Sequence, residues 1–234
     1  LQYLAQLGHD IEPPVPSLFT FNIKDSAFCD LMGTVVDPVV TTIPGTKLRA
    51  KGPLLVTHWG VSGPAVLKLS SYAARLLAEN DYKAPLAISW TGELTRQEVE
   101  ENLLKLQTAN PRKQVATLHP FGLPSRLWLY ILSKLDIDAV KPWAEIGRKT
   151  LNRMIETLVN DQYTIAGKGA FREEFVTCGG VSLSSVNSKT LESKVCPNLF
   201  FAGEVLDIDA ITGGFNLQAA WTTGVVAGQC AAGS

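Results

Sequence analysis

The chain has 234 residues, of which 46% are hydrophobic and 18% are charged, and its net charge is −1. This composition is that of an ordinary globular protein and excludes an intrinsically disordered chain. The 21 basic and 22 acidic residues are interspersed, so we expect neither a nucleic-acid-binding surface nor a polybasic membrane patch. The most apolar segment, residues 219–232, is too short to span a membrane. The length suffices for one large domain or two small ones.

The cysteines and histidines predict neither disulfides nor a metal site. Cys29, Cys178, Cys196 and Cys230 are far apart in the sequence and form no CxxC pair. We therefore expect free thiols in a reducing compartment, most simply the cytoplasm. An organelle stays open, because the chain begins at Leu1 and a targeting segment could precede it. None of the three histidines has another ligand type at helical spacing, so no metal ion is expected.

The first part of the chain predicts the end of a helix, a linker and then antiparallel strands. Residues 1–8 are typical of a final helical turn that Gly8 terminates. Three prolines between residues 13 and 16 predict an extended linker. From residue 17 to residue 57, alternating or β-branched apolar runs are broken by Gly and Pro, and no helical pattern intervenes. This pattern favours antiparallel β structure.

Helical periodicity takes over after residue 58. Ser62 and Pro64 predict the start of one helix, and Thr95 with Glu98 forms a capping-box pattern at the start of another. The remaining elements expected in chain order are a strand at 85–90, amphipathic helices at 124–135 and 142–160, and strands at 162–166 and 171–177. The helical block is therefore predicted to be an insertion between β segments.

The segment from residue 198 to residue 218 carries the strongest functional signal. An apolar run, Leu199 to Ala202, predicts a strand that ends at Gly203 and Glu204. A carboxylate at the end of a strand can accept hydrogen bonds from the hydroxyls of a ribose or ribityl group, and a glycine allows a ligand to approach closely. The alternative is a solvated acidic turn between a strand and a helix, and the spacing alone does not separate the two.

A glycine pair then opens a helix. The backbone N–H groups that follow Gly213 and Gly214, at Phe215 and Asn216, lack partners at a helix start and carry partial positive charge. In a flavin site they would face the pyrimidine edge of the isoalloxazine and stabilise the anionic reduced ring. The alternative is a glycine-rich helix entry with a purely conformational role.

Two further segments carry weaker signals. Residues 176–181 predict a second strand-to-glycine turn, for which a bulge or a hairpin turn is the simpler interpretation. Cys178 within it could be a redox thiol, but it has no partner cysteine or adjacent cation. His58 lies where a strand-like run meets a helix start, so it could transfer protons to or from a substrate. A structural histidine beside the helix cap is the simpler alternative.

Four segments in this order resemble one family. Residues 57–65, 176–181, 189–194 and 198–228 are similar to the bacterial and plant flavoproteins described as aminoacetone oxidase-like or BaiN-like NAD(P)/FAD-dependent oxidoreductases. The resemblance implies a mixed α+β and α/β fold, in which an antiparallel β-barrel-like domain with an inserted helical domain joins part of a Rossmann-like FAD domain. The implied segments are 1–14 and 179–234 for the FAD domain, 15–90 with 162–178 for the barrel, and 91–161 for the helical insertion.

The resemblance also implies which residues contact FAD. Glu204 would bind the ribityl chain beside Gly203, and residues 213–216 would approach the isoalloxazine and the adjacent phosphate. Thr177, Gly179 and Gly180 would line the other side of the ring. Flavoproteins outside this family usually have Asp at the position of Glu204, which leaves the detailed contact at this residue open. Ala210 stands where glycine is expected and Ser185 where an acidic residue is expected, and neither change removes an implied flavin contact.

The implied activity is hydride transfer between FAD and a small organic substrate, with NAD(P)H as a possible electron partner. His58 is the one acid–base candidate. The chain has no GxGxxG loop after a strand, so the phosphate-binding half of the FAD domain is expected to precede Leu1 or to come from a second polypeptide. The alternative is a non-catalytic fragment or binding module that cannot hold FAD by itself.

Overall fold

The computed structural model describes residues 1–169 and 176–233. It divides into two compact units, which are described separately. The barrel unit comprises Thr20–Leu69 and Asp81–Gly169, and the terminal unit comprises Leu1–Phe19, Ser70–Asn80 and Ala170–Ser234. Most of the strand expected over 171–177 lies outside the described residues. The division into an FAD domain, a barrel and a helical insertion expected from the family stays a prediction.

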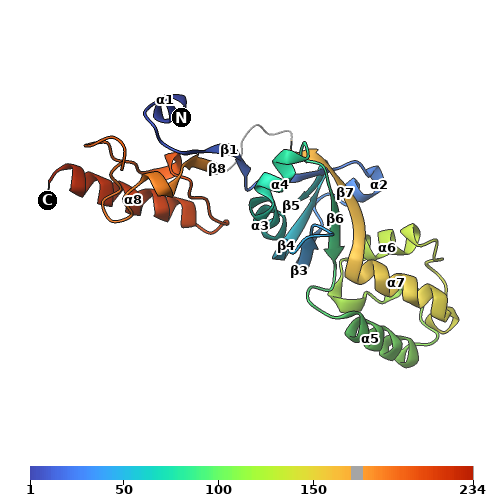
Figure 1. Cartoon of the computed structure of the whole chain (residues 1–234). Coiled ribbons are helices and arrows are strands. Elements are labelled where there is room, and N and C mark those ends of the chain that lie inside the picture. Colours follow the sequence, from blue (N-terminus) through green and yellow to red (C-terminus); the bar gives the residue numbers. More distant parts are fainter. Residues whose placement is uncertain (170–175, 234) are drawn as a thin grey trace. The chain divides into compact units, whose positions relative to one another are not determined.

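The barrel unit is built on a closed antiparallel barrel (Figure 1), which confirms the β architecture expected from the sequence. Its strand order is β2-β5-β4-β3-β6-β7. Inward and outward positions alternate along each strand, and large apolar side chains at the inward positions fill the barrel. Phe21, Leu54, Val61 and Leu86 are fully buried. The six strands are β2 Phe21–Ile23, β3 Val35–Thr42, β4 Arg49–Thr57, β5 Gly60–Ser62, β6 Ala84–Ser89 and β7 Asp161–Lys168.

Short helices connect the barrel strands. The helix α2 (Ser26–Cys29) was not expected from the sequence; the Asp25 side chain caps it by accepting a hydrogen bond from the Phe28 N–H at 3.0 Å. The helix α3 (Pro64–Tyr72) begins with its proline in the first turn, as expected, and α4 (Ala74–Glu79) follows it.

The helical insertion lies between β6 and β7 in sequence (Figure 1) and contains α5 (Arg96–Ala109), α6 (Ser125–Lys134) and α7 (Arg148–Asn160). The capping box of Thr95 and Glu98 at the start of α5 is confirmed in both directions. The prediction of one helix over 142–160 was wrong at its start. Pro142 is extended before a single turn, η3 (Trp143–Glu145), and the extended backbone at Ile146 and Gly147 separates this turn from α7. Two other such turns are η1 (Val115–Thr117) and η2 (Pro120–Gly122).

The terminal unit combines segments from both ends of the chain. The helix α1 (Gln2–Gln6) ends before Gly8, whose φ is +97°, as the sequence predicts. The proline-rich segment is a strand, β1 (Ile11–Ser17), and it pairs antiparallel with β8 (Val176–Val181). Its prolines are tolerated because β1 has β8 as its one partner and its register shifts between Glu12 and Val15.

The strand expected at Leu199–Ala202 is not formed. Phe200 makes one isolated bridge to Glu192, and no strand lies alongside within the described residues. An apolar run becomes a strand only where a neighbour pairs with its N–H and C=O groups. The segment instead packs its side chains into a small core with β8 and the last helix. The elements that follow β8 are η4 (Leu183–Ser185), η5 (Gly203–Val205) and α8 (Phe215–Ala231), and the buried core residues are Val181, Val186, Leu191, Phe201, Leu206 and Ala227.

A buried carboxylate fastens the helical insertion to the barrel. Asp161, which is 3% exposed, accepts hydrogen bonds from Trp90 Nε1 at 2.9 Å and from the Tyr163 hydroxyl at 2.7 Å. The Lys134 ammonium of α6 lies 2.6 Å from its other oxygen. Burial and the neighbouring Asp161 charge raise the pKa of Tyr163, so its hydroxyl stays a hydrogen-bond donor. Each oxygen of this carboxylate is therefore satisfied, as a buried charge requires.

We expect Lys134→Met to lower the free energy of unfolding by about 2–4 kcal/mol, because it leaves a buried carboxylate without its cation. Urea denaturation of the purified chain measures this. Lys105→Met on the exposed surface of α5 is the control and should change stability by less than about 0.5 kcal/mol. Equal, small effects of the two substitutions would contradict the importance of the pair.

Candidate functional site

Three segments of the terminal unit converge around Glu204: the strand β8, the turn η5 and helix α8. The Thr177 N–H of β8 donates to Glu204 Oε1 at 2.6 Å. The Gly203 N–H donates to Thr223 Oγ1 of α8 at 2.9 Å, and Leu206 forms a parallel bridge with Val181. The nine residues that the sequence predicts to bind the cofactor lie on these segments or directly before α8, namely Thr177, Gly179, Gly180, Gly203, Glu204, Gly213, Gly214, Phe215 and Asn216.

Glu204 is exposed and fixed in place at the same time. Its Oε1 is held by the Thr177 amide, and no ion pair within the described residues engages the carboxylate. A carboxylate positioned by a backbone N–H retains acceptor capacity on its second oxygen. Glu204 can therefore accept a hydrogen bond from a ligand hydroxyl without first reorganising.

The start of α8 is an uncapped, exposed helix terminus. Gly213 and Gly214 have φ values of +128° and +85°, which favour glycine, and Gly214 stands at the N-cap without a side-chain bond. The first turn contains no acidic residue. The first intrahelical donor is the Gln218 N–H, so the N–H groups of the preceding turn are available to an anionic partner.

The Asn216 side chain has a role that the sequence did not indicate. Its Oδ1 accepts from the Ala210 N–H at 2.9 Å, and its Nδ2 donates to the Ala210 carbonyl at 2.9 Å. These two bonds tie the acidic loop, residues 206–212 with Asp207 and Asp209, to the start of α8. The side-chain amide is thus occupied within the protein, whereas the backbone N–H of Asn216 remains in the exposed first turn.

Gly179 and Gly180 lie inside β8, so the expected strand-to-glycine turn is wrong there. Their φ values are +114° and +137°. A Cβ at Gly179 would lie 2.6 Å from the Pro13 carbonyl oxygen, and one at Gly180 would lie 2.5 Å from that of Val205. These glycines let β1 and η5 approach β8 closely, which accounts for both without a ligand. That they line a flavin ring stays a prediction.

Cys178 is a buried, neutral thiol. Burial, together with the smaller effect of the Asp209 carboxylate, raises the pKa of Cys178 to about 11; Asp209 also accepts a hydrogen bond from the Ser17 hydroxyl at 2.9 Å. The thiolate is therefore scarce at neutral pH, which argues against a redox or nucleophilic role. Cys29, Cys178, Cys196 and Cys230 are all free thiols, as expected. Within the described residues, no group of three His, Cys, Asp or Glu side chains could hold a metal ion.

His58 belongs to the barrel unit, whereas the predicted cofactor residues belong to the terminal unit. It stands in the turn between β4 and β5 and is exposed. Its ring meets the Trp59 ring edge-on, with 4.3 Å between centroids. The side chain is therefore accessible to a substrate, and its orientation is restricted by the indole.

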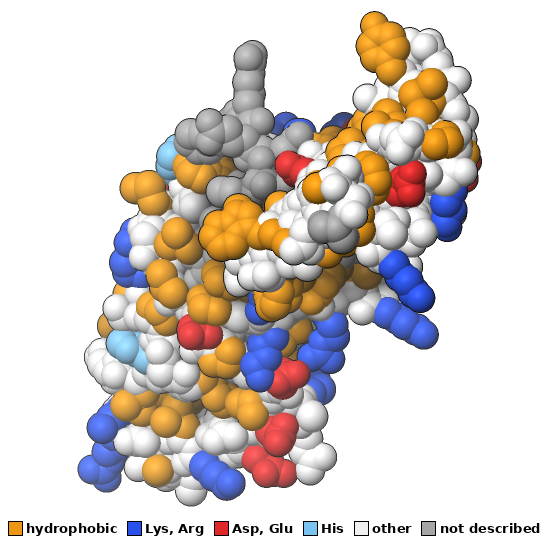
Figure 2. Space-filling view, turned by 90° about the vertical axis from the view of Figure 1, so that its left-hand side faces the viewer, with side chains coloured by type: hydrophobic (Ala, Val, Ile, Leu, Met, Phe, Trp, Pro, Cys, Tyr) orange, Lys and Arg blue, Asp and Glu red, His pale blue; other side chains and the backbone are white. Residues whose placement is uncertain are grey.

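A stripe of apolar side chains along α8 is exposed. Leu217, Trp221 and Val225 recur at four-residue spacing and are 69%, 73% and 59% exposed. Ala227 is the one buried residue of the helix. Figure 2 shows hydrophobic side chains along the part of the terminal unit that faces the viewer. No helix among the described residues is long and apolar enough to cross a membrane.

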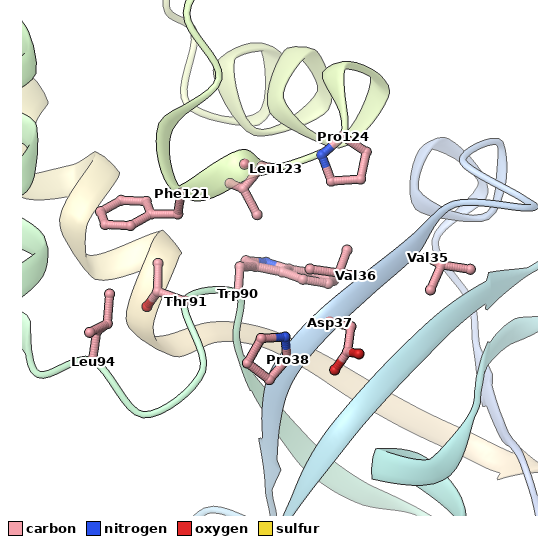
Figure 3. Close-up of a pocket in the computed structure, with 11 residues that line it drawn as sticks. Val35, Val36, Asp37, Pro38, Trp90, Thr91, Leu94, Phe121, Leu123 and Pro124 are labelled. Atoms are coloured by element: carbon pink, nitrogen blue, oxygen red, sulfur yellow. The ribbon is translucent and has the colours of Figure 1, made fainter.

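A pocket of about 360 Å3 lies within the barrel unit, and none of the predicted site residues lines it. In Figure 3, Phe121, Leu123 and Pro124 lie on the segment around η2, with Leu123 pointing toward Trp90, and Pro38 lies on the other side of the indole. Asp37 is the one ionisable side chain in its lining. Most of the side chains that line the pocket are apolar, and none of them is a cation that could pair with a dinucleotide phosphate.

We expect Gly180→Ala to lower the free energy of unfolding by roughly 2 kcal/mol or more, since a Cβ there meets a backbone carbonyl and φ is positive. Gly224→Ala in α8, where nothing lies within 4 Å, should instead be neutral or stabilise by up to about 1 kcal/mol. Urea denaturation of both variants measures the difference. A tolerated Gly180→Ala would contradict the packing role of this glycine.

Residues 15–176 match the family described as the HI0933-like protein barrel and H2TH domain. The chain is 31% identical over 225 residues to a ribosomal RNA dihydrouridine synthase of Haemophilus influenzae, covering 95% of this chain and 53% of that protein. It is 29% identical over 231 residues to the 3-dehydro-bile acid delta(4,6)-reductase of Clostridium scindens, covering 97% and 56%. A ribosomal RNA dihydrouridine synthase of Escherichia coli is 30% identical over 223 residues, covering 93% and 52%.

The chain spans about half the length of the curated relatives it matches. The barrel, the helical insertion and the matched residues all agree with the resemblance found in its four sequence motifs. The chain therefore belongs to the HI0933-like family of flavoprotein-type oxidoreductases.

Proposed function

We propose that this chain is the larger part of the substrate and flavin site of an FAD-dependent reductase. Two observations carry the proposal: the start of α8 is exposed and uncapped, and the Glu204 carboxylate in the turn η5, which packs on the same helix, is held by the Thr177 amide. Positive charge from helix N–H groups and a fixed hydroxyl acceptor are the two features that a flavin with its ribityl chain requires.

The residues present fit FAD in part. Glu204 would accept a ribityl hydroxyl, and the backbone around Gly213 to Asn216 would face the pyrimidine edge of the ring. Gly214 has no atom within 4 Å of a hypothetical Cβ, so a ligand can approach its backbone. Bound FAD would supply the hydride, and NAD(P)H is the electron source that we propose. The chain's contribution is to position the ring and to stabilise its negative charge.

The substrate class that we propose is a small organic compound with a carbon–carbon double bond conjugated to a carbonyl group. The relatives support it: one name denotes a bile acid reductase, and two denote synthases of dihydrouridine, which has two hydrogens more than uridine. Saturation of such a double bond by a reduced flavin adds a hydride to one carbon and a proton to its neighbour. His58, exposed on the barrel unit, is the proton donor that we propose for the second carbon.

The pyrophosphate-binding part of the site would come from a segment outside these 234 residues, in the same polypeptide or in a second one. The relatives are about twice as long as this chain, which supports the proposal. The exposed stripe of Leu217, Trp221 and Val225 is the surface of the terminal unit on which such a segment would pack. If no such segment exists, the chain is a non-catalytic binding module.

The deciding experiment is the visible absorption spectrum of two purified proteins, this chain and the product of its complete reading frame, after incubation with FAD and desalting. A flavin band in the longer protein is expected. Its absence from both proteins would overturn the proposal.

In the longer protein, prepared without FAD, we expect Phe215→Asp to weaken FAD binding about tenfold relative to Phe215→Asn, because it places a negative charge at the start of α8. Phe215 is 55% exposed, and an acidic residue in the first turn of a helix stabilises the fold, so unfolding does not explain a loss. Fluorescence titration of FAD measures the affinities. Equal affinity of the two variants would exclude the start of α8 from the flavin site.

We expect His58→Gln to slow flavin reoxidation by the minimal enone 2-cyclohexenone about 100-fold, because proton delivery is lost. Reduction of the flavin by NADPH should keep its rate, and the solvent isotope effect on reoxidation should change. Anaerobic stopped-flow absorbance separates the two half-reactions. An unchanged reoxidation rate would leave His58 with a structural role.

A further inference from the structure

The pocket of the barrel unit lies where the strands β3 and β6 stop pairing. Their ladder ends at Val40 and Ser89, and the next residue of the chain, Trp90, begins a turn. The part of β3 outside this ladder, residues 35–38, lines the pocket. The cavity therefore follows from strand pairing that stops early, and all of its lining residues belong to the barrel unit.

A bulge in β3 places a carboxylate at the edge of this pocket. The register between β3 and β4 shifts between Val36 and Val39, so that Asp37 and Pro38 together oppose one residue of β4. Val36 is buried, whereas Asp37 is exposed. Figure 3 shows Asp37 beside Pro38 in the lining. The bulge thus brings one charged group to a cavity whose other side chains are uncharged.

Hydrogen bonds hold the walls of the pocket in place. The Trp90 indole is 1% exposed and donates to the Asp161 carboxylate at 2.9 Å, so its ring is a fixed wall. Arg126, in the first turn of α6, donates to the Asp30 carbonyl at 2.5 Å and to the Met32 carbonyl at 3.1 Å. These bonds tie the helical insertion to the barrel next to the pocket. The cavity is therefore formed before a ligand arrives, which lowers the cost of binding.

The lining offers the apolar surface that ring compounds bind. Leu123 is buried, but Val35 and Leu94 are 53% and 37% exposed, so apolar surface is open to solvent. Phe121 has φ +58° and ψ +20°, a left-handed conformation that bulky residues rarely adopt and that occurs preferentially at ligand-binding sites. The volume of about 360 Å3 is in the range of small-molecule sites. It suits a single ring with a short substituent.

The charge of Asp37 selects the kind of substituent. Within the described residues, the Asp37 carboxylate makes no ion pair. Glu93, which precedes Leu94 of the lining, differs in this respect because Arg49 and Lys51 engage it. The negative charge of Asp37 is thus available to a ligand, and an ammonium group complements it.

We propose that this pocket binds a small ring compound that carries an ammonium group. The ring packs against Trp90 and Leu123, and the ammonium pairs with Asp37. An uncharged compound lacks this pairing, and an anionic one is repelled by the carboxylate. The site goes beyond the proposed function, because none of the residues predicted to bind FAD lines it and the charge that it selects is opposite to that of a phosphate.

The test is isothermal titration calorimetry of the product of the complete reading frame at neutral pH, with 2-phenylethylammonium, 2-phenylethanol and 3-phenylpropionate as matched probes. The ammonium compound should bind at least about tenfold more tightly than the alcohol, and the carboxylate compound should bind most weakly. Asp37→Asn should reduce the preference for the ammonium compound over the alcohol to less than about threefold. The control is Glu145→Gln, which removes an exposed carboxylate of the same unit outside the lining and should leave the preference unchanged.

Leu94→Trp tests the location of the site, because it places an indole in the mouth of the pocket and should weaken binding of the ammonium compound at least about tenfold. Leu129→Trp is the matched control, since Leu129 is 44% exposed and does not line the pocket. Absence of binding, equal affinities for the ammonium compound and the alcohol, or equal affinities of the two tryptophan variants would overturn the inference. Binding should be the same with and without FAD, so its failure is distinguishable from failure of the proposed function.

Discussion

The buried Asp161 carboxylate is the interaction on which the barrel unit depends. It stands where α7 ends and β7 begins, and its donors come from the end of β6, from β7 and from α6. The strands β6 and β7 pair in the barrel although the whole helical insertion separates them in sequence. The hydrogen-bonded Asp161 carboxylate thus joins β6 and β7 to the helical insertion. An apolar residue at this position could not fix the orientation of three polar partners.

The sequence predicted those elements whose signals are local. The capping box at Thr95 needs only four consecutive residues, and Gly8 ends α1 by its own conformational freedom. The strand expected at Leu199–Ala202 failed because an apolar run does not reveal whether a paired neighbour exists. The break before α7 was missed because apolar periodicity continued across Pro142 and Gly147.

In the candidate site, too, the sequence predicts local features but not the contacts between residues far apart in the chain. The positions of Glu204 and the glycine pair could be found from the order of strand-like run, acidic residue and helix. The hydrogen bonds from Thr177 to Glu204 and between Asn216 and Ala210 could not be predicted, because a sequence motif does not indicate its distant hydrogen-bond partners.

The acidic loop before α8 is held at three points. Asn216 holds Ala210, the Ser17 hydroxyl holds Asp209, and the Arg75 guanidinium lies 3.5 Å from Asp207. Fixing the backbone of one residue costs about 1–2 kcal/mol of conformational entropy. Because the loop is already ordered when the protein folds, ligand binding does not include this cost. The loop is therefore preorganised: a ligand arriving at the helix start meets a formed surface, and its dissociation does not require the loop to melt.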